Sequence, residues 1–472
     1  MNDTSTLLPS LQARFKSRSM GMKLIVICGL AVAMTIPALF VGGLVEERTR
    51  RATDVTAEIS SHVGGQQMFL GPTLAIPYTV PAQTIGSTPE HGTYLVFPVQ
   101  GGATVKTRTE ERRRSLFKVP VFEADLRFDA AFDLTGVPLA APLGAVLDWS
   151  HAELVVGVSD ARGALADGTM TANGKTDTFV PIDSIDGLSL DSNGSQNQRT
   201  PLTLFGVMVS QLAQPDAKFE VSATLRFSGA QRIAILSYGK TTHLNIEGDW
   251  PNPSFDGGFL PVKRTVSAQD FSGEWLVPWI ARGISAEGRS SSITGLDSTA
   301  LGVSFVELAD PYQSVNRSLK YVLLFLGLLF LSYFIFEVTT GKRVHPAQYI
   351  LVGIAQIIFY LLLLSFSERI CFDFGFLVAG AATVMLLSAN AAWIFASRAQ
   401  GVRALACFSL LYSLIYLLLR LEDNALLVGA IASFIAVAAA MYFTRGIDWY
   451  SSLTVSDAQE QQTTMLGPKE PA

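Results

Sequence analysis

Two long apolar runs in the C-terminal third constrain this chain most strongly. They cover Leu319–Phe336 and Tyr349–Phe366, and the polar link Glu337–Pro346 lies between them. Each run has about 18 residues and almost no charge, and a helix of that length crosses roughly 30 Å of hydrocarbon. Because the link is too short to hold a domain, the two runs predict an antiparallel transmembrane hairpin.

The hydrophobicity of the chain is unevenly distributed. The mean hydropathy over 472 residues is +0.34, and only 16% of the residues are charged. The apolar excess lies in residues 22–45 and 319–443, whereas residues 46–318 have an ordinary soluble composition. A region of that length can bury one large core or two smaller ones. The net charge of −5 gives no indication of a nucleic-acid partner.

The first apolar run, Leu24–Val45, is interpreted as an uncleaved signal anchor. A cleavable signal peptide is the alternative, since Ala31-Val32-Ala33 resembles a cleavage site. However, the run continues past that tripeptide to about 22 residues, which is long for a signal peptide. Pro37 is expected to kink this helix.

The charges of the short loops alternate along the chain. Basic residues precede the first helix and occupy the hairpin link, the link before the fifth helix and the start of the tail. Residues 367–373 and 420–424 are neutral to acidic. By the positive-inside rule, both termini are then cytoplasmic. The predicted helices cover about residues 22–45, 319–336, 347–366, 372–396, 404–420 and 425–443.

The expected fold class is therefore an α+β membrane protein. It has six transmembrane helices and a large, mostly β periplasmic domain between the first and the second. The predicted parts are a cytoplasmic N-terminus (1–21), the signal anchor (22–45), the periplasmic domain (46–318), a five-helix bundle in the lipid bilayer (319–443) and a partly disordered cytoplasmic tail (444–472).

The region 46–318 is predicted to begin with a helical stem, Glu46–Val63, and to continue as short strands. Alternating or β-branched runs recur there and are separated by Gly, Pro, Asn and Asp. Pro201–Gln214 is predicted as a short helix or a buried pair of strands. The expected strands are Leu74–Val80, Thr93–Val99, Ala103–Thr109, Ala124–Phe132, Ala152–Val158, Phe219–Ser228, Ala234–Tyr238 and His243–Gly248.

Two segments of this region look alike. Val121–Phe128 (VFEADLRF) and Lys218–Phe227 (KFEVSATLRF) alternate polar and apolar residues and end in Arg-Phe. They either mark two related halves of a β sandwich or are two independent strands with an ordinary half-buried pattern. The second interpretation is favoured because that pattern is common.

No catalytic constellation is present in the sequence. None of the five histidines is paired with another His, Cys or acidic residue at metal-ligand spacing. Neither a G-x-S-x-G turn nor a phosphate-binding GxxxxGK[ST] loop occurs. We therefore expect a non-enzymatic protein with no cofactor and no metal.

Two motifs of the soluble region are candidates for ligand contact. Asp160 and Arg162 follow a strand-like run, where an Asp-x-Arg turn either binds an anion or closes a structural turn. Trp250 and Phe255 bracket two prolines that exclude a central strand. We expect a fixed loop there, with the two rings as packing anchors or as ligand contacts.

The polar residues of the predicted bundle indicate a scaffold rather than a conduit. Gln356 and Asn390 are expected to hydrogen-bond between helices. Lys342, Arg343 and His345 either contact anionic lipid head groups or serve only to orient the chain.

Seven stretches spread along the chain form a recognisable pattern. The most specific is Phe336–Gly353 (FEVTTGKRVHPAQYILVG), which contains the hairpin link. The others are Gly71–Pro77, Ser159–Gly163, Trp250–Pro261, Asp310–Tyr312, Tyr360–Glu368 and Thr444–Tyr450. In these stretches the chain resembles the CreD family. The resemblance implies an inner-membrane protein of Gram-negative bacteria that is associated with envelope integrity and envelope stress, and it carries over no catalytic residues.

Three functions are weighed. The favoured one is a non-enzymatic membrane protein whose periplasmic domain binds an unidentified envelope component or protein. The alternative is a transporter or transport-accessory subunit for lipid or envelope precursors, since missing buried charges argue against ion coupling but not against lipid passage. The third is a hydrolase that uses acids such as Asp160 or Asp249, which the missing motifs disfavour.

Overall fold

The computed structural model describes residues 20–82, 88–114, 117–141, 143–185, 188–191, 199–305, 311–420 and 425–445. The predicted N-terminal segment before Met20 and the predicted tail after Arg445 lie outside these residues. The chain divides into two compact units, residues 1–51 with 309–472 and residues 52–308. We call them the helical unit and the β unit, and we describe each by itself.

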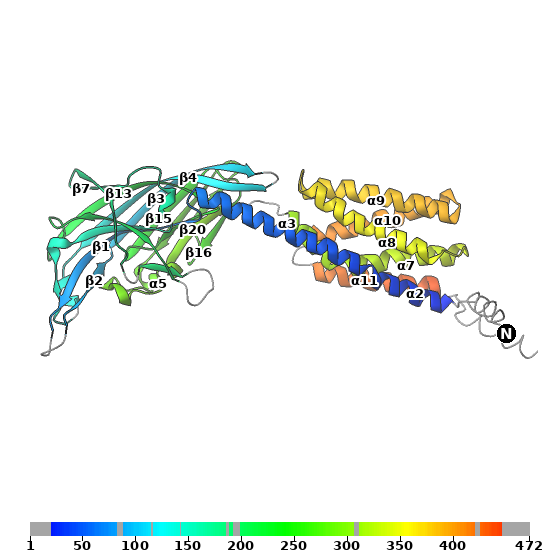
Figure 1. Ribbon diagram of the computed structural model, residues 1–472, viewed down its shortest axis with the longest axis horizontal. Helices are drawn as coiled ribbons and strands as arrows, with labels where there is room; N and C mark the ends of the chain where they lie inside the picture. The colour runs from blue at the N-terminus through cyan, green and yellow to red at the C-terminus, as the bar shows by residue number, and fades with distance from the viewer. Residues whose placement is uncertain are drawn as a thin grey trace, which may run out of the picture. The chain divides into compact units, whose positions relative to one another are not determined.

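The helical unit contains the apolar helices (Figure 1). The N-terminal ones are α2 (Met20–Ala33) and the first part of α3 (Thr35–His62). The others are α6 (Pro311–Lys320), α7 (Val322–Thr340), α8 (Pro346–Ser367), α9 (Phe372–Phe395), α10 (Arg398–Arg420) and α11 (Ala425–Thr444). The two apolar runs of the hairpin are thus helices α7 and α8, as predicted.

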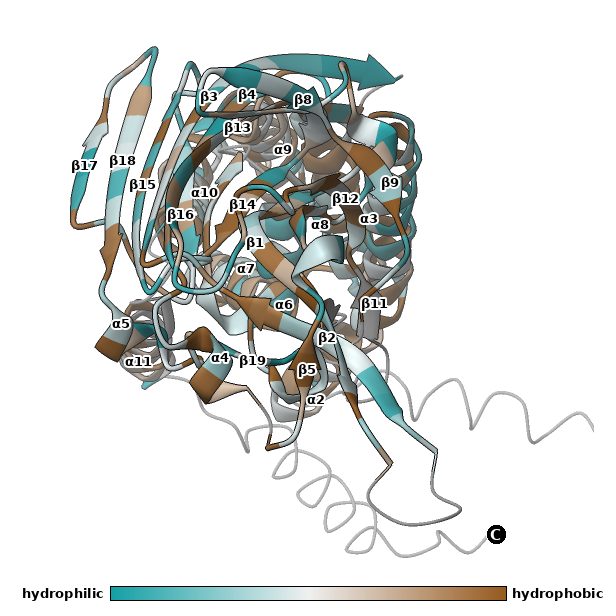
Figure 2. Cartoon of the chain, turned by 90° about the vertical axis from the view of Figure 1, so that its left-hand side faces the viewer, coloured by the Kyte–Doolittle hydropathy of each residue, from teal (hydrophilic) through white to brown (hydrophobic). Residues whose placement is uncertain are grey.

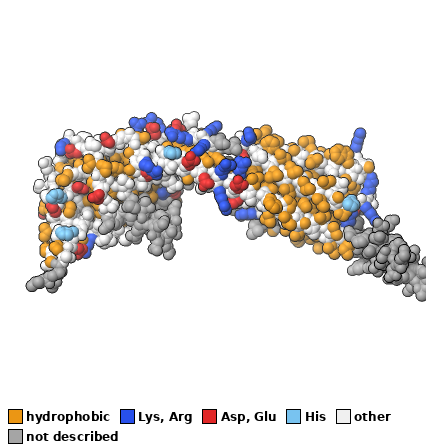
Figure 3. Space-filling view, in the orientation of Figure 1, with side chains coloured by type: hydrophobic (Ala, Val, Ile, Leu, Met, Phe, Trp, Pro, Cys, Tyr) orange, Lys and Arg blue, Asp and Glu red, His pale blue; other side chains and the backbone are white. Residues whose placement is uncertain are grey.

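Five segments of the described chain are long and apolar enough to cross a membrane. They are Gly21–His62 and helices α7 to α10. Helix α11 has a shorter apolar stretch, Leu427–Ala439. The membrane-protein class is confirmed, and the sixth span stays a prediction. In Figure 3 the visible face of the helical unit is almost continuously hydrophobic, whereas charged side chains are scattered over the visible face of the β unit.

The helical unit begins at Ala309, ahead of the predicted boundary at residue 319. Helix α6 accounts for this difference, because it contacts α8 and α10. Its Tyr312, Val315 and Ser318 are buried, and they recur at the three-residue spacing that lines one helix face. The chain therefore joins the bundle before its apolar run starts.

The first apolar segment is interrupted just before its proline. Pro37 lacks the N–H group that would bond to the carbonyl of Ala33, and α2 ends at Ala33. The Met34 amide still donates to Leu30 O at 2.9 Å, and α3 begins at Thr35. Helix α3 then continues to His62, which confirms the helical stem predicted for Glu46–Val63.

Buried tyrosines pair with the polar residues inside the bundle. Tyr412 of α10 donates to Gln356 Oε1 of α8 at 2.5 Å. Tyr333 of α7 donates to Asn390 Oδ1 of α9 at 3.2 Å. Both expected interhelical hydrogen bonds are therefore confirmed.

The β unit consists mainly of two large sheets. The strands of the ten-stranded sheet are β1 (Gln67–Val80), β2 (Glu90–Val96), β5 (Val146–Leu147), β6 (Glu153–Val158), β9 (Val180–Ile182), β12 (Thr203–Met208), β14 (Arg232–Leu236), β16 (Pro253–Gly257), β19 (Glu287–Arg289) and β20 (Ala300–Phe305). Seven of them follow the order β16–β20–β14–β1–β6–β12–β9, while β2 and β5 pair with β1, and β19 pairs with β2.

The second sheet has eight strands. They are β3 (Gln100–Arg114), β4 (Phe117–Asp133), β7 (Thr169–Ala172), β8 (Lys175–Thr178), β13 (Lys218–Ala230), β15 (Thr241–Gly248), β17 (Lys263–Val266) and β18 (Phe271–Val277). Their order is β17–β18–β15–β3–β4–β13–β7–β8. A separate two-stranded ribbon joins β10 (Ser189–Asp191) to β11 (Arg199–Pro201).

The apolar faces of the two large sheets share one core. Phe69 of β1 meets Phe227 of β13 with ring centroids 5.3 Å apart, and Phe122 of β4 meets Phe305 of β20 at 5.2 Å. These rings belong to one continuous cluster of buried residues. Along β4 and β13 buried and exposed residues alternate, as expected for antiparallel strands with one solvated face. The strand-rich region is therefore a β sandwich.

The structure confirms one interpretation for this region and corrects two predictions. The favoured interpretation of the two similar segments is confirmed: they are not halves of a sandwich, because they lie in β4 and β13, which pair antiparallel in one sheet with Leu126 opposite Leu225. Within residues 201–214, the central strand β12 forms between β6 and β9, rather than a helix or a strand pair. Pro253–Gly257 is strand β16 rather than a loop, and it occupies the sheet edge, where proline is tolerated.

The strand register defines two ends of the sandwich. At the stem end, the Ala230 amide of β13 donates to Gly65 O at 2.7 Å, and Arg114 of β3 pairs with Glu58 of α3. The register therefore brings the last residues of β4 and β18 to the opposite end, which we call the distal end. There the short helices α4 (Val137–Ala140) and α5 (Trp279–Arg282) follow these strands (Figure 2).

Candidate functional site

A shallow groove crosses the outer face of the eight-stranded sheet. Two depressions of about 450 and 540 Å³ share Gly102, Asp129 and His243 in their linings. Their other lining residues extend from Leu276 of β18 to Thr171 of β7. We call these two depressions together the sheet groove.

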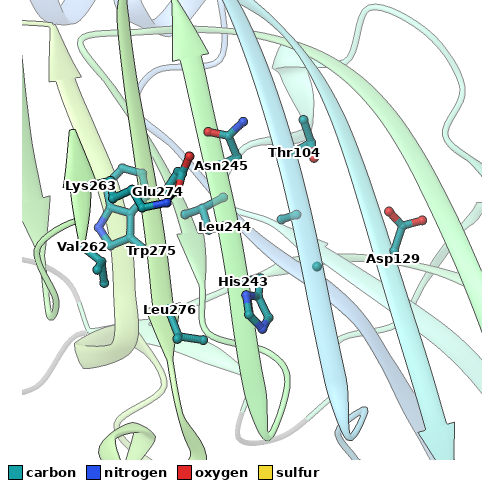
Figure 4. Close-up of a pocket in the computed structure, with 12 residues that line it drawn as sticks. Thr104, Asp129, His243, Leu244, Asn245, Val262, Lys263, Glu274, Trp275 and Leu276 are labelled. Carbon is teal, nitrogen blue, oxygen red and sulfur yellow. Dashed lines mark ion pairs between the residues drawn. The ribbon is translucent and has the colours of Figure 1, made fainter. Parts of the chain in front are cut away.

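The strand register explains why the groove lies here. Gly102 is opposite both His243 and Asp129, and it has no side chain, so a gap opens between the two (Figure 4). This row of directly opposed residues comprises Leu276, His243, Gly102, Asp129, Ser222 and Thr171. The row crosses six strands and is about 24 Å long at the usual strand spacing.

Tyr238 supports the sheet beneath the groove. Its hydroxyl donates to Gly102 O at 2.7 Å and to Asp129 O at 3.0 Å. Its ring leaves no room for a Cβ at Gly71 or Gly101, where added atoms would lie 2.5 and 2.9 Å from ring carbons. Burial raises the pKa of the Tyr238 hydroxyl well above its usual value, so it remains a donor. The glycines of β1 and β3 thus make room for the Tyr238 ring, which supports the sheet from its core side, beneath the groove.

The groove presents two charge pairs and one further carboxylate, that of Glu220. Arg127 lies 3.2 Å from Asp129, and Lys263 lies 3.2 Å from Glu274. Thr104 and Asn245 add uncharged hydrogen-bonding groups in the neighbouring row. Among the described residues, no group of three or more His, Cys, Asp and Glu side chains could hold a metal ion. The arrangement therefore suits a hydroxyl- or amide-rich ligand better than a strongly charged one.

Asp160 and Arg162 lie at the stem end. Asp160 caps the 3₁₀ turn Ala161–Gly163 by accepting from the Arg162 amide at 3.0 Å. The Arg162 guanidinium donates to both oxygens of the same carboxylate, at 3.1 and 2.6 Å to Oδ2. These side-chain hydrogen bonds lower the pKa of the Asp160 carboxyl. Because the two side chains bind each other, the geometry favours the structural turn over an anion site.

Gln67 is the buried centre of the stem end. Its amide nitrogen donates to Gly64 O at 2.9 Å, to Asp160 O at 3.0 Å and to Ser228 O at 3.3 Å. Its Oε1 accepts from the Ser159 hydroxyl at 3.2 Å. We call these five residues with Gly163 the stem junction. The junction links the end of the stem, through β1 and β6, with β13 of the other sheet.

Trp250 and Phe255 lie in the core rather than in the groove. The Trp250 ring packs edge-on against Phe305 at 6.3 Å, and the Phe255 ring lies 5.8 Å from Trp275. Both rings border the buried cluster between the sheets. Their positions favour the packing interpretation.

The polar link of the hairpin makes contacts within the helical unit. Lys342 Nζ donates to Phe395 O at the end of α9. His345 Nδ1 accepts from the Ala347 amide at 3.2 Å and caps α8. All three side chains are exposed, but Lys342 and His345 are engaged in these contacts, so Arg343 is the one best placed to meet a lipid head group.

Glu337 is the centre of a second buried cluster. Only 1% of this residue is exposed, and its carboxylate accepts from Lys23 Nζ and from the Tyr349 hydroxyl, the latter at 3.1 Å. Lys23 also donates to Val344 O at 2.6 Å. The cluster links α2 to α7 and α8. Contacts inside the helical unit therefore explain why Glu337, at the start of the hairpin link, and Tyr349, just after it, are polar.

The seven predicted interaction residues are thus divided among the stem end, the core and the hairpin link. None of them lines the sheet groove. Sequence reasoning missed the groove because its residues come from separate strands. The available signal was the doublet Gly101-Gly102 ahead of an expected strand, since glycine weakens strands and marks close approaches.

Comparison with known proteins confirms the family resemblance. Residues 19–450 match the family described as Inner membrane protein CreD. The Inner membrane protein CreD of Escherichia coli (strain K12) is 31% identical over 454 residues, which cover 92% of this chain and 95% of that protein. With several apolar helices, the chain is a multi-pass inner-membrane protein. It belongs to the CreD family.

Proposed function

We propose that this protein supports cell-envelope integrity by binding a polar envelope polymer in its sheet groove, without catalysing a reaction. In this proposal the β unit is periplasmic, and both termini are cytoplasmic. The single observation that carries the proposal is the groove of paired charges, hydroxyls and amides across six strands.

The charge pattern of the helical unit supports this orientation. Basic residues follow α7 at Lys342 and Arg343 and begin α10 at Arg398. Acidic residues Glu368 and Asp373 lie where α8 ends and α9 begins. The positive-inside rule assigns the basic ends to the cytoplasm.

The ligand class follows from the groove's shape and chemistry. A shallow path of about 24 Å suits an extended chain better than a compact small molecule, which prefers a concave site. Neutralised charge pairs and exposed hydroxyl and amide groups suit an uncharged, hydroxyl-rich chain. A glycan strand of the envelope has this chemistry.

The test is binding of the full-length protein, in zwitterionic nanodiscs, to isolated cell-wall sacculi. Gly102→Tyr places a ring in the groove, and its Cβ fits because an added Cβ at Gly102 meets nothing closer than 3.8 Å. We expect this variant to bind at least about tenfold more weakly. Gly102→Ala is the matched control, since it leaves the groove open and should bind like the natural protein.

Two results decide against the proposed function. One is that the natural protein fails to sediment with sacculi. The other is that Gly102→Tyr, shown by its thermal unfolding to be folded, sediments as well as Gly102→Ala.

A further inference from the structure

The distal end of the sandwich carries two apolar turns that face solvent. Leu139 of α4 is 92% exposed and Leu143 just beyond it is 94% exposed. Trp279 and Ile280 of α5 are 55% and 95% exposed. We call these four residues the distal tips. An exposed apolar patch on a folded unit commonly marks an interaction site.

Both turns are built in the same way. Each begins with Val-Pro, and the valines, Val137 and Val277, are buried in the core. The proline restricts the backbone, and the apolar residue that follows it, Leu139 or Trp279, is exposed. Two separate parts of the chain thus present apolar residues on anchored turns at one end of the unit.

Arg282 holds the second turn in place. Its Nε donates to Ser237 O at 2.8 Å, and its guanidinium carbon lies 4.1 Å from the centre of the Phe97 ring. Arg282 itself is only 3% exposed. Arg282 therefore anchors the α5 turn to the core, while Trp279 and Ile280 remain exposed to solvent.

The tips lie on two turns whose leading strands are not neighbours in the sheet. Strands β18 and β4, which lead into the two turns, are three strand spacings apart, or about 14 Å. Polar residues Gln100, Lys240 and Thr241 lie at the strand ends between them. A protein partner of ordinary affinity needs one continuous patch of about 800 Å². A few apolar side chains on two short turns instead suit shallow insertion into a lipid interface.

The chemistry around Trp279 also fits a lipid interface. Tryptophan favours the head-group level of a bilayer. Lys240 Nζ lies 5.5 Å from the centre of the Trp279 ring, so a positive charge accompanies the apolar turn. That pairing suits a surface with anionic head groups.

The tips lie far from the stem. Strand β13 runs 13 residues from the stem junction to the distal end, which is about 43 Å of strand. We propose that the distal tips insert into a lipid surface that bears anionic head groups. This site is distinct from the sheet groove, so it does not depend on the proposed glycan binding.

The experiment is flotation of the full-length protein, held in zwitterionic nanodiscs, with vesicles that contain or lack phosphatidylglycerol. We expect co-flotation with the anionic vesicles, weakened by salt. The double change Trp279→Ser with Ile280→Ser should lower the bound fraction at least about tenfold. The single change Ile280→Ser should lower it less, and it provides a second variant should the double change impair folding.

The matched control is Leu165→Ser with Val266→Ser, which removes two exposed apolar side chains outside the distal end. It should float like the natural protein, as should Gly102→Tyr. The inference is overturned if the natural protein does not float with anionic vesicles. It is equally overturned if both tip variants float as the natural protein does, or if the natural nanodiscs associate with each other instead of with vesicles.

Discussion

The stem end and the distal end of the β unit differ in the kind of side chain that each buries or exposes. At the stem end a polar side chain, Gln67, is buried and fully hydrogen-bonded. At the distal end apolar side chains, such as Ile280, are exposed. Burying a polar group is costly unless its partners are present, and exposing an apolar group has a cost that only a partner surface removes. The first end is thus built for stability, and the second is available for binding.

The largest change in stability, and so the strongest test of this comparison, is expected from Gly163→Val at the stem end. A Cβ there would lie 2.4 Å from Ser228 O and 2.5 Å from Gln67 Nε2. We expect the free energy of unfolding of the β unit to fall by about 3 kcal/mol or more, because backbone must move. Thermal unfolding followed by the emission of buried Trp250 and Trp275 measures this loss. Gly102→Val adds the same side chain at a position where a Cβ would meet nothing closer than 3.8 Å, and it should change stability little.

Gln67→Leu should have the next largest effect. It removes the donor to three carbonyls and leaves them buried. We expect a loss of about 2–4 kcal/mol in the free energy of unfolding, measured by chemical denaturation. Gln66→Leu is the neighbouring control, since Gln66 is exposed, and a similar loss there would contradict the role of the junction.

A smaller effect is expected from Asp160→Asn, and it should depend on pH. Hydrogen bonds from Arg162 lower the pKa of Asp160 in the folded state. Its contribution is therefore present above the unfolded-state pKa of about 3.9 and is lost as the pH falls through the folded pKa. The variant should lose about 1 kcal/mol at neutral pH and show a shallower decline in acid. Parallel acid-unfolding curves for the two proteins would disprove this.

The smallest change in stability is expected at the distal tips. Ile280→Ser should alter the free energy of unfolding by less than about 0.5 kcal/mol, because the side chain contacts solvent in the isolated protein. Its effect should appear only in vesicle flotation. A loss of stability as large as that of Gln67→Leu would show that the distal turn belongs to the core and would remove the contrast between the two ends.

Local patterns were enough to predict much of the fold. The apolar runs became helices α7 and α8, and the alternation in residues 124–132 and 219–228 became β4 and β13. Period and length decide these elements, because a buried face must recur at the helical or strand repeat. Gln356 and Asn390 were also predictable, since polar groups inside a bundle need partners.

Other features depend on pairings that no local pattern contains. The edge position of β16 and the central position of β12 follow from strand order. The likeness of the two Arg-Phe segments was ambiguous until their register placed them side by side. Strands β18 and β20 were not expected at all, because short runs near glycines carry a weak signal.

By itself the sequence determined that this chain crosses a membrane and carries a large strand-rich region, since hydrophobic length and periodicity are properties of contiguous residues. Only the tertiary structure decided that Asp160 serves the stem junction, that Gly102 opens a groove between His243 and Asp129, and that Leu139 and Ile280 share one end of the sandwich. These relations join residues tens to more than a hundred positions apart, and strand register alone sets them.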